Sequence, residues 1–202
     1  MPESKRVFLS KVSLSWPATR NPYEWHRALW QLFPEQPNAE RDFLFRVEQQ
    51  RPGQGSIVLM QSRQAPIRNI ESAELLAEPK TINLANIQEG ASLRFRLNAN
   101  VVKTIADAKD AKRRVRVPLL KEEEQLAWLK RKLAGAAELL DASVQGGGPL
   151  YFKQKGRAGK LVTVMFDGVL RVTDCSQFFE MVVSGVGPAK AFGCGMLSLA
   201  KA

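Results

Sequence analysis

Cysteine and histidine are scarce in this chain. Its 202 residues include two cysteines, Cys175 and Cys194, and a single histidine, His26. Two cysteines are too few for a disulfide framework or a cysteine-based zinc site, and one histidine excludes a clustered-histidine metal centre. We therefore expect no metal, and imidazole acid–base chemistry near neutral pH would have to use His26.

Long apolar runs and cofactor fingerprints are also missing. No apolar stretch approaches the roughly 20 residues that a membrane helix needs, and the segment 1–6 is polar, without the apolar core of a signal peptide. The P-loop, dinucleotide and Ser–His–Asp patterns are absent. We expect a reduced, cytoplasmic protein with no cofactor and no membrane partner.

Positive charge, in contrast, is in excess. Thirty Lys and Arg against 20 Asp and Glu give a net charge of +10, and two basic runs lie in the second half. They comprise Lys103, Lys109, Lys112, Arg113, Arg114, Arg116 and Lys121, then Lys153, Lys155, Arg157 and Lys160 at an expected hairpin tip. A charge run is usually a solvated face, but two runs in one half favour a groove for a polyanion, with nucleic acid the first candidate.

Glycine is concentrated near the end of the chain. Four glycines fall within residues 185–195, here called the glycine-rich loop, together with Pro188 and Lys190. Glycine permits positive φ and close backbone approach. Successive N–H groups can form a concavity that binds anions, to which Lys190 adds a charge. The simpler interpretation is a turn that enters the last strand.

The hydrophobic pattern predicts the same order of elements twice, β-α-β-β-α-β. The first set has strands at 7–14, 42–48, 56–61 and 81–85 and helices at 23–33, after an Asn21 cap and Pro22, and at 70–77. The second has strands at 92–97, 150–153, 161–166 and 196–200 and helices at 120–133 and, capped by Asp174, up to Val183. This order is typical of ferredoxin-like (RRM-like) domains. We expect an α+β protein with two in tandem, residues 1–88 and 91–202.

The first helix has two different faces. Helical spacing places Trp25, Leu29 and Leu32 on a core side, and Tyr23, His26, Arg27 and Trp30 on the opposite side. The second group offers a proton-transfer group, a hydroxyl to orient it and a cation for a phosphate. The alternative is that His26 is a structural surface residue.

Six short motifs occur in a specific order along most of the chain. They are Leu9-Ser10-Lys11-Val12; Tyr23-x-x-His26 continuing to Pro34; Arg41 to Glu48; Phe95 to Thr104; Arg116 to Leu119 with Gln125-x-Ala127-Trp128-Leu129; and Gly187-Pro188-Ala189-Lys190-x-x-Gly193-Cys194-Gly195. In this order the chain resembles the CasE family, the CRISPR RNA-processing endoribonucleases of type I-E systems.

The resemblance implies metal-independent cleavage of the CRISPR repeat stem-loop RNA. The RNA's own 2′-hydroxyl would attack, leaving a 2′,3′-cyclic phosphate and a 5′-hydroxyl, with Tyr23 and His26 as the proton-transfer pair. The glycine-rich loop, with Gly187, Lys190, Gly193 and Gly195, would abut the RNA. The enzyme would then hold its product and join the other Cascade subunits.

One position departs from the family pattern. Some relatives place a lysine farther along the first helix, where this chain has Gln31 after Trp30. The positive charge that would stabilise the phosphorane formed during cleavage would therefore have to come from Arg27 or from a residue outside the helix.

Recognition of the RNA should depend mainly on the shape of its stem. The Lys153–Lys160 tip would enter where the A-form groove opens at a helix end, and Lys112, Arg113, Arg114 and Arg116 would lie on flanking phosphates. Two alternatives stay open: a noncatalytic RNA-hairpin-binding protein of the same fold, and a protein–protein scaffold whose charge is incidental.

Overall fold

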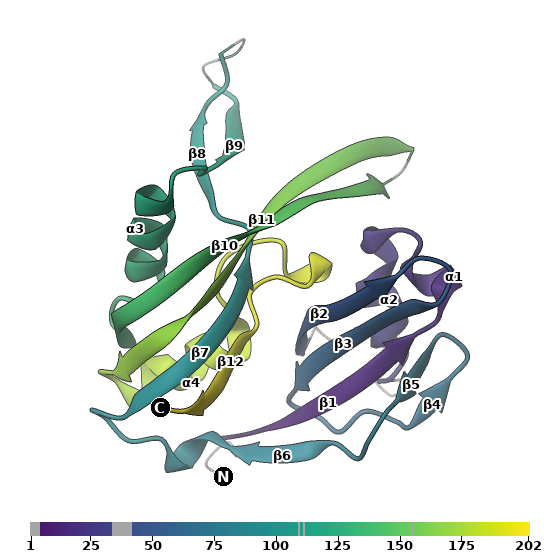
Figure 1. Ribbon diagram of the computed structural model, residues 1–202, viewed down its shortest axis with the longest axis horizontal. Coiled ribbons are helices and arrows are strands. Elements are labelled where there is room, and N and C mark those ends of the chain that lie inside the picture. Colours follow the sequence, from purple (N-terminus) through teal and green to yellow (C-terminus); the bar gives the residue numbers. More distant parts are fainter. Residues whose placement is uncertain (1–4, 34–41, 109, 111, 155) are drawn as a thin grey trace.

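The computed structural model describes residues 5–33, 42–108, 110, 112–154 and 156–202 (Figure 1). Within them, two antiparallel sheets lie side by side, one from each half of the chain. None of the helices formed by these residues is long and apolar enough to cross a membrane.

The N-terminal sheet is centred on β1. Its strands are β1 (Arg6–Leu14), β2 (Phe43–Arg51), β3 (Gly55–Ser62), β4 (Asn69–Ile70), β5 (Ala73–Leu75) and β6 (Lys80–Asn83). They run in the order β2-β3-β1-β5-β4, and β6 shares with β5 the edge of β1 opposite β3. The helical turns are α1 (Trp16–Thr19), η1 (Pro22–Glu24), α2 (Trp25–Trp30) and η2 (Leu84–Asn86).

The C-terminal sheet has longer strands. These are β7 (Ser92–Ala99), β10 (Ala137–Gln154), β11 (Arg157–Val172) and β12 (Leu197–Lys201), in the order β10-β11-β7-β12. Its helices are α3 (Glu122–Leu133), α4 (Cys175–Ser184) and η3 (Lys190–Phe192). A separate two-stranded hairpin, β8 (Val102–Ala106) with β9 (Arg114–Pro118), projects from the body (Figure 1) and is here called the arm.

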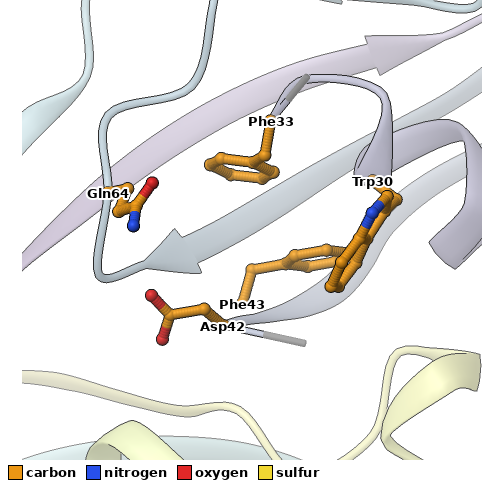
Figure 2. Close-up of a pocket in the computed structure, with 5 residues that line it drawn as sticks. All are labelled: Trp30, Phe33, Asp42, Phe43 and Gln64. Atoms are coloured by element: carbon orange, nitrogen blue, oxygen red, sulfur yellow. The ribbon is translucent and has the colours of Figure 1, made fainter. Parts of the chain in front are cut away.

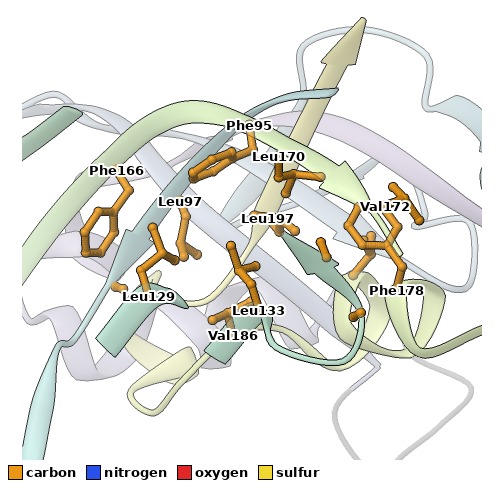
Figure 3. Close-up of a cluster of buried hydrophobic side chains, with 14 of the residues drawn as sticks. Phe95, Leu97, Leu129, Leu133, Phe166, Leu170, Val172, Phe178, Val186 and Leu197 are labelled. Atoms are coloured by element: carbon orange, nitrogen blue, oxygen red, sulfur yellow. The ribbon is translucent and has the colours of Figure 1, made fainter. Parts of the chain in front are cut away.

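The C-terminal core follows from the alternation along β7. Phe95 and Leu97 are buried against α3 and α4, where they meet Leu129, Leu133 and Phe178 (Figure 3). Arg96, which points to the other face, pairs with Asp167 at 2.7 Å. Burying one apolar side chain such as Phe95 or Leu97 stabilises the fold by about 1.5–3 kcal/mol. The structure confirms the predicted strand at 92–97 and the predicted helices at 120–133 and up to Val183. It also confirms the cap, because the Asp174 side chain accepts two backbone N–H bonds.

The N-terminal core is built on the first helix. Trp25, Leu29 and Leu32 are buried among side chains of β1, β2 and β3, so the predicted core side is confirmed. The cap is confirmed too, because the Asn21 side chain accepts from the N–H of Tyr23 and Pro22 follows it. The helix is shorter than predicted: η1 precedes α2, and α2 ends at Trp30.

Four predicted elements are wrong in kind or extent. The helix at 70–77 is instead the short hairpin β4–β5, because β5 adds to the free edge of β1 and buries Ala73. The strand at 81–85 ends at Asn83, whose side chain caps η2. The strands at 150–153 and 161–166 are parts of the much longer β10 and β11, since a register shift absorbs the break at Gly146–Pro149. The arm was not predicted as a hairpin.

The two halves contact one another directly. Gln61 Nε2 donates to the Val182 carbonyl at 2.9 Å, and buried Arg46 donates to Ser198 Oγ at 2.7 Å while it pairs with Glu48. Val7 also packs in the C-terminal core. The domain boundary at Gln88–Ala91 stays a prediction; the two sheets lie on either side of it.

Candidate functional site

Tyr23 and His26 lie together at the start of the first helix. Tyr23 belongs to η1 and His26 to α2, and their ring centroids are 5.5 Å apart in an edge-to-face arrangement. Both side chains are half-buried. The one-turn spacing of the sequence therefore brings an imidazole and a phenol into contact.

The glycine-rich loop packs against this pair. Its short helix η3 contacts η1 and α2, and the ring of Phe192 lies 6.2 Å from that of Tyr23. Lys190 is the first residue of η3. Segments separated by more than 160 residues thus form one site, which local sequence patterns cannot reveal.

The backbone geometry of this loop has a packing cause. Gly187 has φ +81°, and a Cβ there would lie 2.9 Å from the Trp128 ring; at Gly195 (φ +92°) it would lie 3.0 Å from the Val186 carbonyl. Only glycine adopts such a backbone without strain. The bare Cα of each therefore faces protein, and contact of Gly187, Gly193 and Gly195 with RNA stays a prediction.

Phe152 joins the loop to the long hairpin β10–β11. Its ring centroid is 4.5 Å from that of Phe192, and its ring lies over Gly159, where a Cβ would approach it to 2.2 Å. Tyr23, Phe192 and Phe152 thus form an aromatic row across helix, loop and hairpin. Sequence reasoning missed Phe152 and Phe192; the available signals were an aromatic inside the glycine-rich loop and one beside a basic tip.

The basic residues of the hairpin lie on both of its faces. By the strand register, Lys153 and Lys160 share one face with exposed Tyr151, over whose ring Lys160 Nζ lies at 5.6 Å. Arg157 lies on the other face, where it lines a cleft with Phe152. Lys155 lies outside the described residues.

The arm brings one of its arginines toward the hairpin. Arg114 and Arg116 face the same way, opposite Ala106 and Thr104. Arg116 and Lys160 line one cleft of about 400 Å³ together with Phe192. Both cations thus border the same space as the glycine-rich loop.

The other residues of this basic run lie at the two ends of the arm. Lys112 and Arg113 are in the segment between the strands, where Arg113 pairs with Asp107 at 3.5 Å. Lys109 lies outside the described residues. Lys103 pairs with Glu124 at 3.3 Å, so part of this run contacts acids of the chain itself.

Two residues predicted beside His26 lie elsewhere. Arg27 pairs with Glu24 at 2.9 Å and borders a different cleft, with Gln31 and Ser72. Trp30 packs on Phe43, in an aromatic crevice that Figure 2 shows. The structure therefore brings Tyr23 and His26 to the loop but not these two.

The same crevice is edged by Phe33, Asp42 and Gln64 (Figure 2). Burial raises the pKa of Asp42, an effect that the positive charge of Arg63 partly offsets. The crevice is narrow, and Trp30 and Phe33 both pack there on Phe43, a residue of the N-terminal core.

The cysteines and acids offer little further chemistry. Burial raises the pKa of the Cys194 thiol to about 12, so this thiol is neutral at physiological pH. The Cys175 thiol donates to the Ile87 carbonyl. Within the described part of the chain, no three His, Cys, Asp or Glu side chains gather to hold a metal ion.

Comparison with known proteins gives consistent full-length matches. The family described as "CRISPR associated protein" matches residues 7–201. The chain is 44% identical over 200 residues to the Cascade subunit CasE of Escherichia coli K12, covering 96% of this chain and 99% of that one. It is 33% identical over 220 residues to the CRISPR-associated endoribonuclease Cse3 of Thermus thermophilus, covering 96% and 100%.

Solved structures agree with these matches. The crystal structure of Cas6e from E. coli K-12 superposes with a TM-score of 0.83 at 42% identity, covering 96% of this chain and all of that one. T. thermophilus Cse3 bound to an RNA that represents a pre-cleavage complex superposes with a TM-score of 0.76 at 32% identity, covering 96% and 99%. These matches confirm the predicted fold of two ferredoxin-like domains.

Proposed function

Since this chain belongs to the CRISPR associated protein family that includes CasE and Cse3, we propose that it is the endoribonuclease that cuts CRISPR repeat RNA into mature guide RNA. One observation carries the proposal: an imidazole–phenol pair, a glycine-rich loop and a basic hairpin converge on one place through Phe192. The chain matches an RNA-bound relative over nearly its whole length.

The reaction requires a nucleophile, a leaving group and two proton transfers. The 2′-hydroxyl of the RNA loses its proton and attacks the adjacent phosphorus, and the bond from phosphorus to the 5′-oxygen breaks. That oxygen takes up a proton, so the products are a 2′,3′-cyclic phosphate and a 5′-hydroxyl. The intramolecular nucleophile avoids the entropy loss of a bimolecular step, and proton transfer through His26 and Tyr23 supplies roughly 10²–10⁴-fold.

A cation outside the first helix stabilises the phosphorane in this proposal. Arg27 is engaged with Glu24 and borders another cleft. Lys190 lies on η3, which contacts α2, and Lys160 and Arg116 line the cleft beside Phe192. Charge placed where it develops in the transition state is an effective catalytic contribution.

The RNA stem is held by the two basic hairpins. On β10–β11 the contacts come from Lys153, Lys155, Arg157 and Lys160. On the arm they come from Lys112, Arg113, Arg114 and Arg116. The glycine-rich loop, with Gly187, Lys190, Gly193 and Gly195, lies against the strand that is cut. Cations on two sides of one cleft suit the closely spaced phosphates of a duplex.

The proposal also includes where the protein works and which partners it has. It works in the cytoplasm, retains its product and assembles with the other Cascade subunits. The name of its E. coli relative describes that protein as a Cascade subunit. Its two ferredoxin-like domains meet at Gln88–Ala91.

One experiment tests the activity directly. The purified protein is incubated with its own repeat RNA in excess EDTA, and the product ends are identified by their susceptibility to phosphatase and kinase. We expect cutting at one position, with a cyclic phosphate and a 5′-hydroxyl. Binding without cutting would favour the noncatalytic RNA-binding alternative, and cutting only after magnesium or manganese is restored would favour metal chemistry.

A further inference from the structure

The side chain of Asn21 contacts both its own turn and Lys153, which lies 132 residues farther along the chain. Its Oδ1 accepts from the backbone N–H of Tyr23 at 3.3 Å and from that of Lys153 at 3.1 Å. Its Nδ2 donates to the carbonyl of Lys153 at 2.7 Å. The amide therefore pairs with both backbone groups of Lys153, as an adjacent strand would.

These bonds connect two parts with different tasks. Asn21 caps η1, the turn that carries Tyr23 and leads directly into the helix of His26. Lys153 lies in β10 next to Phe152, which packs on Phe192. Capping η1 needs only an acceptor, so the donor half of the amide is used for the hairpin alone.

We propose that Asn21 is a positioning residue for RNA cleavage. Its amide holds the hairpin that grips the RNA stem at a fixed distance from Tyr23 and His26, so that the bound stem presents one phosphate to the imidazole. The inference rests on the proposed endoribonuclease activity. A displacement of about 1 Å at the reacting atoms can slow catalysis roughly a hundredfold, so two hydrogen bonds at this junction matter beyond their own strength.

Two substitutions separate the cap from the connection. Asn21→Ser keeps an oxygen that can cap η1 but is too short to reach both groups of Lys153. Asn21→Asp keeps both acceptor bonds and turns an oxygen toward the Lys153 carbonyl in place of the donor. Serine and aspartate are both good N-caps, so both proteins should fold with nearly unchanged melting temperature.

At saturating protein, we expect both variants to cut repeat RNA about tenfold more slowly than the original chain in single turnover, on the scale of one or two exposed hydrogen bonds. Product mapping at nucleotide resolution should also show more cutting at neighbouring phosphates, because the stem is no longer held in register with His26. Asn83 provides the matched control: it caps η2 through the N–H of Ala85, and Asn83→Ser and Asn83→Asp should change neither rate nor position.

A wild-type rate in Asn21→Ser would overturn the proposal. Slower cutting at an unchanged single position would also overturn it, since it would leave Asn21 as a cap for Tyr23 only. If Asn21→Ser lowers the melting temperature, the more conservative Asn21→Asp variant decides whether Asn21 has the positioning role. His26→Ala is run in parallel: if that variant is inactive while Asn21→Ser is normal, only the positioning role fails, whereas an original chain that cuts no repeat RNA removes the proposed function itself.

Discussion

The two basic hairpins of this chain look alike in sequence but are held in different ways. The arm is a two-stranded sheet of its own, and its exposed Arg113 and Lys103 pair with acids of the chain. The hairpin β10–β11 continues the C-terminal sheet and is tied to the site through Phe152 and Lys153. Exposed ion pairs contribute little, about 0–1 kcal/mol, so these pairs hold the arm weakly, whereas ring and backbone contacts join β10–β11 to the site.

This difference separates affinity from catalysis. Cations on either hairpin neutralise phosphates and raise affinity, since counterion release does not depend on how the hairpin is held. Among the described residues, β10–β11 is joined to Tyr23 through the rings of Phe152 and Phe192. We therefore expect changes in the outer part of the arm to alter binding, and changes near the tip of β10–β11, where it contacts the site, to alter cutting.

The largest effect on cleavage should come from His26, at the site that the hairpin β10–β11 contacts. His26→Ala should reduce single-turnover cleavage by about 10²–10⁴-fold, because it removes the proton-transfer group. Affinity for repeat RNA should stay nearly unchanged, since the basic hairpins are intact. Cleavage assays at saturating protein, with filter binding beside them, measure both; a normal cleavage rate in the variant would remove His26 from the mechanism.

A paired charge deletion tests the comparison itself. Arg157→Ala with Lys160→Ala on β10–β11, and Arg113→Ala with Arg114→Ala on the arm, should each flatten the log–log salt dependence of binding by up to roughly two units. Cutting of the bound RNA should slow only in the β10–β11 variant. Binding titrations over a range of salt, with single-turnover rates at saturation, give both quantities.

An unchanged salt slope for one pair would show that its hairpin is only a solvated face. Equal slowing of cutting by the two pairs would contradict the difference between the hairpins.

A single methyl group can loosen the hairpin without changing its charge. Gly159→Ala places a Cβ 2.2 Å from the Phe152 ring and must displace it from Phe192. We expect cutting of bound RNA to fall about tenfold, as misplaced reacting groups predict, with the salt slope unchanged. Gly146→Ala, on the same strand pair with open space around its Cβ, is the matched control and should behave as the original chain. Equal rates in the two variants would mean that the aromatic row does not position the hairpin.

The smallest effect should come from Tyr23→Phe. The ring remains to pack on His26 and Phe192, and only the hydroxyl is lost. Since one hydrogen bond contributes about 0.5–1.5 kcal/mol, the single-turnover rate should fall several-fold, clearly less than in His26→Ala. A loss as large as that of His26→Ala would assign the main proton transfer to the phenol.

Much of the local structure could be predicted because it depends on nearby residues. Strand alternation identified β7, helical spacing identified the buried side of α2, and the Asn21 and Asp174 caps marked where helices begin. The segment 70–77 was assigned wrongly because its conformation depends on a free edge of β1, far from it in sequence.

Sequence alone determined the charge excess, the contact between Tyr23 and His26 one turn apart, and the family motifs. These follow from composition and from periodicities within a single element. Only the tertiary structure decided that Phe192 and Phe152 complete the site, that Arg27 turns to Glu24, and that Asn21 reaches Lys153. The physical reason is that periodicity reports which face of an element is buried, whereas the partner of that face is set by packing between segments that no local pattern connects.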